Sequence, residues 1–142
     1  MIETMFTPYF QISVICLTTV AIIVLYGTYR CQRSDFHDPL TKRLAPPPFD
    51  RYTDGWAFLH FAFYGLLAYF FPSWPHLVFI WLVGVLWEII ESIFHDHPFY
   101  ISRCHYTIGT DQESGWWYGR YEDIIMNTLG MILGWFLAIQ LR

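Results

Sequence analysis

Residues 77–91 read LVFIWLVGVLWEIIE and place two acids, Glu88 and Glu91, inside a segment that otherwise has the composition of a membrane span. The residues before Glu88 carry no charge, and the apolar run ends only at Phe94. A spacing of three residues puts both carboxylates on one face of a helix. Ionisable groups at membrane depth are costly and usually face a protein interior or a wet cavity, so this pair is a candidate functional site.

The rest of the chain repeats this apolar character. Its 142 residues are 55% hydrophobic and only 14% charged. Four apolar runs cover 8–29, 55–71, 76–94 and 121–141, each close to the 20 or so helical residues that cross a bilayer core. The runs show no alternation of period two, as strands of a barrel would. The sequence therefore predicts an all-α polytopic membrane protein with four transmembrane helices in one bundle.

Basic residues predict how this bundle is oriented. Most of the eight Lys and Arg residues lie between the first and second runs or between the third and fourth: Arg30, Arg33, Lys42, Arg43, Arg51, Arg103 and Arg120. The positive-inside rule makes both connections cytoplasmic and leaves both termini outside. The first run has no basic segment before it and is long for a signal peptide, so we expect a retained anchor. No basic patch typical of nucleic-acid binding is visible.

Under this topology, polar side chains from three helices share one depth. His60, Glu88 and Asn127 each lie about six residues, or 9–10 Å, from the cytoplasmic end of their helix. Glu91 and Asp123 lie about one turn closer to water. We expect this layer to form a single polar cluster near one membrane face.

Small residues continue the polar face of the last helix. Asp123 and Asn127 are four residues apart, and Gly130 and Gly134 extend the same face. A Gly-x-x-x-Gly pair permits close approach of two helices, so the polar cluster is predicted to face the bundle interior.

The cluster suits acid–base chemistry or metal binding. The candidate catalytic residues, which are also the candidate ligands of a divalent metal ion, are His60, Glu88, Glu91 and Asp123. The candidate substrate-binding residues are Arg120, Asn127 and Tyr64, the last sharing a helix face with His60. Each assignment has a structural alternative. The glutamates could pair with Arg120, His60 and Asn127 could hold helices together, and Asp123 could simply begin a helix.

The two long connections differ in character. The first contains Pro46-Pro47-Pro48 and cannot be regular helix, so 1–53 is taken as an anchor helix followed by a proline-rich loop. The second, 95–120, mixes glycine, acids and aromatics and is predicted to form a lid over the three-helix core, 54–142. The three cysteines have no zinc spacing, and two of them should face a reducing cytoplasm, so no disulfide is expected.

Three motifs together resemble the VanZ-like superfamily of small bacterial membrane proteins. These are His60 within LHFAFYGLL, then WEIIES at 87–92, then YEDIIMNTLGMILG at 121–134. The last fits the family pattern Asp-x-x-x-Asn-x-x-Gly-x-x-x-Gly, and GTDQESGWWYGRYED at 109–123 is similar to related inner-membrane families. The resemblance covers about 54–138. It implies a location in the bacterial inner (plasma) membrane and a link to the cell envelope, since the namesake group is associated with teicoplanin resistance. It implies no particular reaction.

Two functions of different classes remain open. The first is a hydrolase or transferase acting on a membrane lipid or a lipid-linked envelope intermediate, with Glu88 as general base and a divalent metal ion as candidate cofactor. The second is a non-enzymatic membrane protein, either a proton-coupled permease or a structural subunit. Its carboxylates would carry protons or lock helices together. Four helices are few for a transporter, so a permease would require a homo-oligomer.

Overall fold

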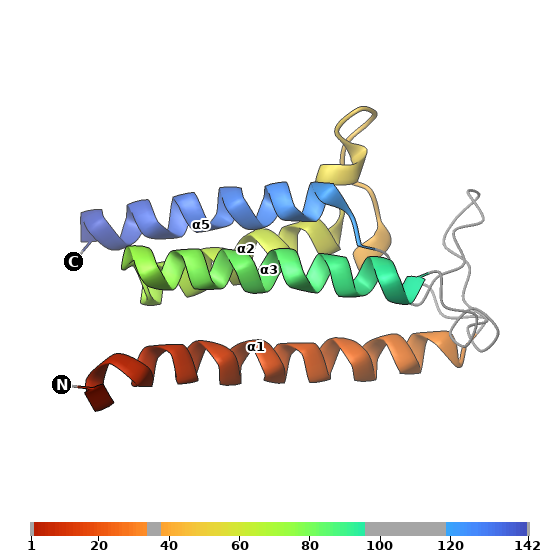
Figure 1. Cartoon of the computed structure of the whole chain (residues 1–142). Helices are drawn as coiled ribbons and strands as arrows, with labels where there is room; N and C mark the ends of the chain where they lie inside the picture. The colour runs from red at the N-terminus through yellow and green to blue at the C-terminus, as the bar shows by residue number, and fades with distance from the viewer. Residues whose placement is uncertain (1, 34–37, 96–118, 142) are drawn as a thin grey trace.

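The computed structural model describes residues 2–33, 38–95 and 119–141, and within these ranges the chain is helical with no strand. The α-helices are α1 (Ile2–Cys31), α2 (Gly55–Phe70), α3 (Trp74–His95) and α5 (Tyr121–Leu141). The proline-rich connection contains only two short 3-10 turns, η1 (Pro39–Thr41) and η2 (Asp50–Tyr52). Both ends of the chain lie at the same end of the bundle (Figure 1). The all-α prediction is confirmed. Apart from its ends, the predicted 95–120 lid falls outside the described residues.

Three of the four helices are long and apolar enough to cross a membrane, namely Thr7–Cys31 of α1, Trp74–Phe94 of α3 and Tyr121–Leu141 of α5. The helix α2 is equally apolar but has 16 residues. Its length is about 24 Å at 1.5 Å per residue, somewhat short of a core about 30 Å thick. The structure therefore supports membrane integration through three helices.

The ends of two helices differ from the prediction at prolines. The helix α1 begins at Ile2 rather than at residue 8, so Pro8 lies inside it. Proline removes one backbone donor there, which membrane helices tolerate. The helix α3 begins at Trp74 with Pro75 in its first turn, where the missing N–H costs no helical hydrogen bond.

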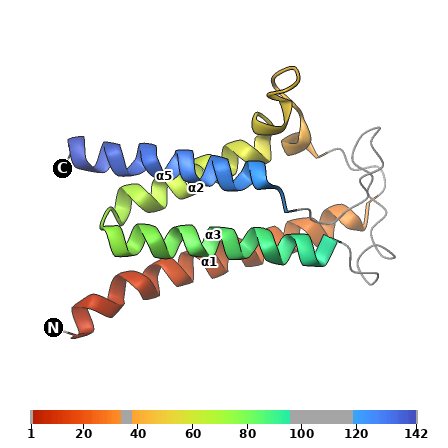
Figure 2. The ribbon, with the colours of Figure 1, turned by 45° about the horizontal axis from the view of Figure 1, so that its top comes forward.

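Glycines bring the backbones of α2 and α5 into contact around Gly65, Gly130 and Gly134, where the two helices lie side by side (Figure 2). A Cβ on Gly134 would collide with the carbonyl oxygen of Gly65, and one on Gly130 would collide with that of Phe61. The residues that share this face of α5, including Asp123 and Asn127, are buried. The predicted small-residue interface is confirmed, and its partner is α2.

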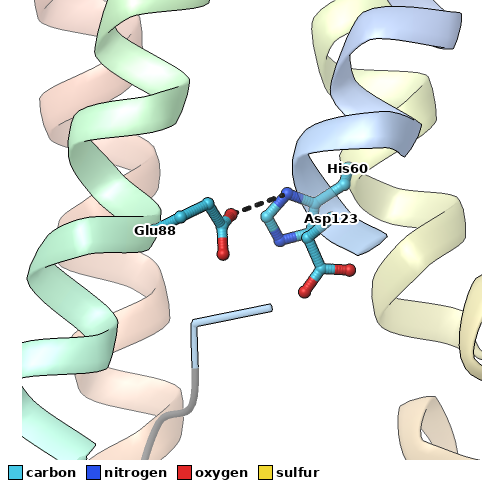
Figure 3. A group of neighbouring side chains, drawn as sticks. All are labelled: His60, Glu88 and Asp123. Carbon is cyan, nitrogen blue, oxygen red and sulfur yellow. Dashed lines mark ion pairs between the residues drawn. The ribbon is translucent and has the colours of Figure 1, made fainter. Parts of the chain in front are cut away.

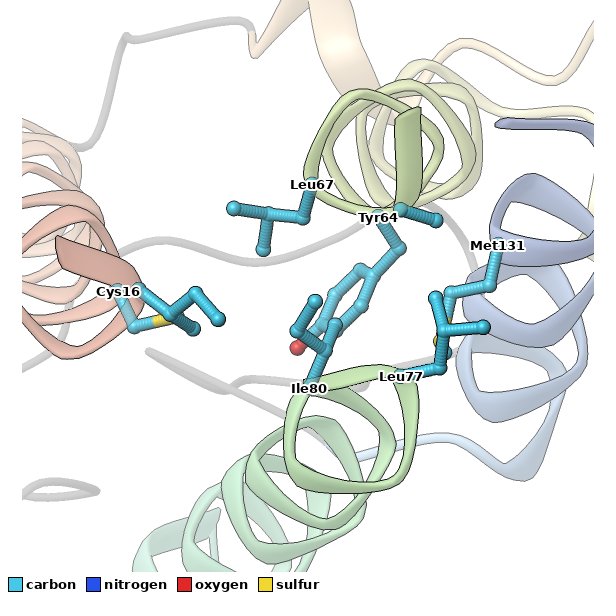
Figure 4. Packing of buried hydrophobic residues seen from close by; sticks show 8 residues of the cluster. Cys16, Tyr64, Leu67, Leu77, Ile80 and Met131 are labelled. Atoms are coloured by element: carbon cyan, nitrogen blue, oxygen red, sulfur yellow. The ribbon is translucent and has the colours of Figure 1, made fainter. Parts of the chain in front are cut away.

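An apolar cluster joins all four helices below the polar layer (Figure 4). Its buried members are Ile12, Cys16, Tyr64, Leu67, Ala68, Leu77, Ile80 and Met131. Gly84 of α3 allows the close fit of the Tyr64 ring, since a Cβ there would lie 2.8 Å from the phenol oxygen. Near the chain termini, the Tyr9 ring of α1 packs edge-on against His76, with centroids 4.8 Å apart.

At its other end, α1 is attached through a buried carboxylate, Asp38. One oxygen of Asp38 accepts hydrogen bonds from the Tyr26 hydroxyl at 2.8 Å and the Leu40 amide at 2.9 Å. The other accepts from the Arg30 guanidinium at 2.8 Å and the Trp56 indole N–H at 3.2 Å. Four donors thus complete the shell of this carboxylate and tie α1 to α2.

The cysteine prediction is wrong in one respect. Cys16 is a free, buried thiol, but Cys31, at the end of α1, is disulfide-bonded. The expectation of no disulfide rested on the compartment that the charges predict, and the spacing of three cysteines does not reveal which thiols the fold brings together.

We predict that Gly134→Ala destabilises the protein by about 1–3 kcal/mol, because the new Cβ meets the Gly65 carbonyl and forces the helices apart. Intrinsic propensity alone would favour alanine over glycine in a helix. Thermal unfolding in detergent, followed by circular dichroism, measures the effect. Leu133→Ala on the exposed face of the same helix is the control and should cost less. An unfolding temperature for Gly134→Ala at or above that of the wild type would contradict the interface.

Candidate functional site

Three polar side chains from three helices converge in one cluster. His60 of α2, Glu88 of α3 and Asp123 of α5 each place one nitrogen or oxygen so that these atoms lie within 4.8 Å of one another. Glu88 reaches toward the His60 ring, and Asp123 lies beside that ring (Figure 3). Glu88 and Asp123 are 4% and 3% exposed. The prediction that these residues meet is confirmed.

Asn127 orients the imidazole. Its side-chain oxygen lies 2.9 Å from His60 Nδ1. An amide oxygen can only accept, so this contact selects the tautomer in which Nδ1 carries the hydrogen and Nδ1–H donates a hydrogen bond to Asn127. The lone pair of the neutral ring is then on Nε2. His60 also stacks on Tyr64, with ring centroids 6.4 Å apart and planes 9° apart.

Glu88 is held by the chain segment that leads into α5. Its Oε2 accepts the backbone N–H of Arg120 at 3.2 Å. The preceding residue must be glycine, because a Cβ on Gly119 would collide with the carbonyl oxygen of Glu88. The other oxygen, Oε1, lies 3.6 Å from His60 Nδ1. Gly119 thus lets the backbone approach α3 closely enough to fix one side of this carboxylate.

The Arg120 guanidinium joins the starts of α2 and α5. One terminal nitrogen lies 2.9 Å from Asp54 Oδ2, and Nε lies 3.4 Å from Asp123 Oδ2. Asp54 also caps α2, accepting the Ala57 N–H at 2.7 Å. We expected this guanidinium to neutralise Glu88 or Glu91 or to grip a substrate anion. Its contacts with Asp54 and Asp123 make it part of the framework, and its binding of a substrate anion stays a prediction.

Asp54 is the residue that sequence reasoning missed. The sequence does contain a signal for the Asp54–Arg120 pair. Each of these residues directly precedes an apolar run, and the polar residues within both runs are predicted to share one layer. Opposite charges at two helix starts on the same side of a membrane are natural partners.

The carboxylates of the cluster lack some of the hydrogen bonds that they could accept, whereas Asp38 accepts four. Within the described part of the chain, Glu88 Oε1, Asp123 Oδ1 and Asn127 Nδ2 are buried without a hydrogen-bond partner. Leaving such groups unsatisfied costs about 1–3 kcal/mol each, and more when the group is charged. Asp38 in the same protein accepts hydrogen bonds from four donors. The oxygens Glu88 Oε1 and Asp123 Oδ1 are therefore exceptional in lacking a partner among the described residues, and they are candidate ligand-binding atoms.

Glu91 and Tyr64 lie beside this group. Glu91 is buried one turn further along α3, on the face of Glu88. The group whose donor atoms converge, among the described residues, consists of His60, Glu88 and Asp123 without Glu91. Tyr64 belongs to the apolar cluster and lines a cavity together with His60.

That cavity has a volume of about 320 Å³ and lies between α1, α2 and α3. Its walls are mostly apolar, with Ile23, Phe63 and Trp87 among the lining side chains. His60 is the point at which the cavity meets the polar cluster. Its size falls at the lower end of the range for small-molecule sites.

No protein-family model, curated protein or solved structure matches the chain.

We predict that Asp54→Asn destabilises the protein by about 1.5–3 kcal/mol, because it removes the charged partner of the 2.9 Å hydrogen bond from the Arg120 guanidinium. Asparagine retains the oxygen that caps α2, so the loss reports the ion pair. Asp50→Asn is the matched control. It breaks the pair with Arg43, whose side chain is 52% exposed, and should cost less than about 1 kcal/mol. Chemical denaturation in mixed micelles measures both. Equal losses would show that Arg120 does not depend on Asp54.

Proposed function

We propose that this protein is a membrane-embedded hydrolase or transferase that acts on a lipid or lipid-linked substrate at His60, Glu88 and Asp123. One observation carries the proposal: two buried carboxylate oxygens and an imidazole converge without completing one another's hydrogen bonds. A purely structural cluster would be expected to close its shells, as Asp38 does.

The apolar cavity supports a lipid as the substrate. The cavity is lined by helices that have the composition of membrane spans, and His60 is one of its lining residues. A hydrocarbon chain in this cavity would place a polar headgroup linkage at the cluster. Such a linkage could be a phosphate ester or a carboxylic ester.

The chain's own residues supply a proton path for this reaction. Glu88 Oε1 would take the proton from an attacking water or hydroxyl, and the same proton would pass to the leaving oxygen as the old bond breaks. His60 Nε2 carries a single lone pair, which is available either to a proton or to a cation but not to both. Asp123, held by Arg120, would orient the nucleophile.

We place the protein in the bacterial inner membrane, with four crossings and both termini outside. The VanZ-like resemblance and the seven Lys and Arg residues in the two connections support this placement. The disulfide at Cys31 argues for the opposite orientation, because disulfides persist in oxidising compartments. The charges act during insertion, before a disulfide forms, and therefore set the orientation. A disulfide facing the cytoplasm would be a redox-labile one.

Reporter fusions test this orientation. Alkaline phosphatase is active only outside the cytoplasm, and green fluorescent protein fluoresces only when it folds inside. We expect a fusion after Leu141 to give phosphatase activity and a fusion after Phe49, in the first connection, to fluoresce. The reverse pattern at both positions would exclude the proposed topology and make the disulfide a stable structural bond.

The proposed reaction is tested with purified protein in vesicles that contain phosphatidylglycerol and a polyprenyl diphosphate. Phosphorus-31 NMR follows the headgroups. We expect turnover that falls by more than about 100-fold in Glu88→Gln, because a positioned general base contributes about that much. Glu122→Gln is the matched control. It removes an equally buried acid, beside Asp123 in α5, and should keep turnover.

The non-enzymatic alternative gives a different result in the same vesicles. A permease would show no headgroup change but a proton flux, measured with an internal pH dye, that disappears in Glu88→Gln. A structural role would show neither signal, and Glu88→Gln would lower membrane abundance. Either result would overturn the enzymatic proposal.

A further inference from the structure

We propose that His60, Glu88 and Asp123 bind one divalent transition-metal cation of the Mn²⁺ or Zn²⁺ type. The site uses the same side chains as the proposed reaction, but it requires no turnover. Binding can therefore be tested even if the protein is not an enzyme.

The geometry fits a cation with small adjustments. One donor atom from each of the three residues already lies within 4.8 Å of the others. Ligands about 2.0–2.2 Å from a shared metal lie roughly 3–4 Å from each other. Rotation of the two carboxylates about their side-chain bonds would close this difference, and the helices need not move.

The open oxygens supply the second reason. Glu88 Oε1 and Asp123 Oδ1 are buried and have no hydrogen-bond partner among the described residues. Each carboxylate is anchored through its other oxygen, Glu88 by the Arg120 amide and Asp123 by the Arg120 guanidinium. Fixing one oxygen while leaving the second open is the arrangement expected of a monodentate ligand.

The charges point the same way. Asp54, Glu88, Glu91 and Asp123 are buried acids around this layer. The guanidinium that contacts two of them belongs to Arg120. Among the described residues, buried carboxylates outnumber the guanidinium groups that contact them. Such an excess is neutralised either by protons or by a cation, and a divalent cation between Glu88 and Asp123 would neutralise both carboxylates.

The donor set selects the class of cation. Imidazole favours transition metals, whereas Ca²⁺ takes six to eight oxygens and Mg²⁺ retains its waters. A set of one imidazole nitrogen and two carboxylate oxygens leaves room for a water, as catalytic zinc sites do. A cation here would lower the pKa of that water and so supply the nucleophile.

Asn127 is the positioning residue of this site. By accepting the hydrogen bond of His60 Nδ1–H, it leaves Nε2 for the cation, in the way that partners of metal-binding histidines fix the ring. We expect Asn127→Ala to weaken the affinity by about 10-fold, the lower end of what such partners contribute.

The experiment measures Mn²⁺ and Zn²⁺ binding to the full chain, purified in detergent and stripped with a chelator. We expect one Mn²⁺ per chain by electron paramagnetic resonance, with spin-echo modulation from one nitrogen ligand. Asp123→Asn should weaken the affinity by at least about 100-fold, and His60→Gln should remove the nitrogen modulation. Glu122→Gln, which is equally buried and neighbours Asp123, should leave both signals within twofold.

Folding is checked separately, because loss of a buried charge can disrupt a bundle. Each variant must keep the helical circular dichroism and the gel-filtration volume of the wild type. Should Asp123→Asn fail this check, Asn127→Ala and His60→Gln still test the site through the nitrogen signal. Wild-type protein that binds no Mn²⁺ or Zn²⁺ at millimolar concentration, or binds them equally well in Asp123→Asn and Glu122→Gln, would overturn the proposal.

The two proposals fail in distinguishable ways. Stoichiometric binding without lipid turnover would leave the cation site standing and remove the enzyme. Lipid turnover that survives complete chelation would do the reverse.

Discussion

The backbone contact between α2 and α5 determines how His60, Asn127 and Asp123 lie relative to one another. Gly65, Gly130 and Gly134 remove the side chains that would otherwise separate the two helices. The helices therefore approach closely enough for His60 and Asn127 to form a hydrogen bond at 2.9 Å. Because α5 also begins at the site, the same contact brings Asp123 beside the imidazole. Larger residues on this face would widen the spacing and break the geometry without touching a polar residue.

Two buried carboxylate centres in one bundle show how differently such groups can be used. Asp38 receives four hydrogen bonds and fastens α1 to its neighbours. Glu88 and Asp123 each receive support on one oxygen and leave the other open. The first arrangement minimises the cost of a buried charge. The second keeps that cost in place, and such unsatisfied groups concentrate at binding and catalytic sites.

Helix periodicity and depth were sufficient to predict that His60, Glu88 and Asp123 meet. Both depend on residue spacing, which the chain displays directly. The role of Arg120 was not predictable in the same way, because its long side chain could reach several acids. Gly119 lets the backbone before α5 pack against α3, and this contact fixes where Arg120 lies. No local sequence pattern predicts that a glycine makes such a contact. The Cys31 disulfide was not predicted because the spacing of three cysteines does not reveal which thiols pair.

The way α1 is attached has a mechanical consequence. It is held near one end by Tyr9 against His76 and through Ile12 and Cys16 in the apolar cluster. At the other end it is held by Asp38. Between these points its side chains form one wall of the 320 Å³ cavity. A helix that is attached at both ends moves most at its middle. We therefore expect thermal motion of α1 to open the cavity toward the surrounding lipid while both attachments stay intact.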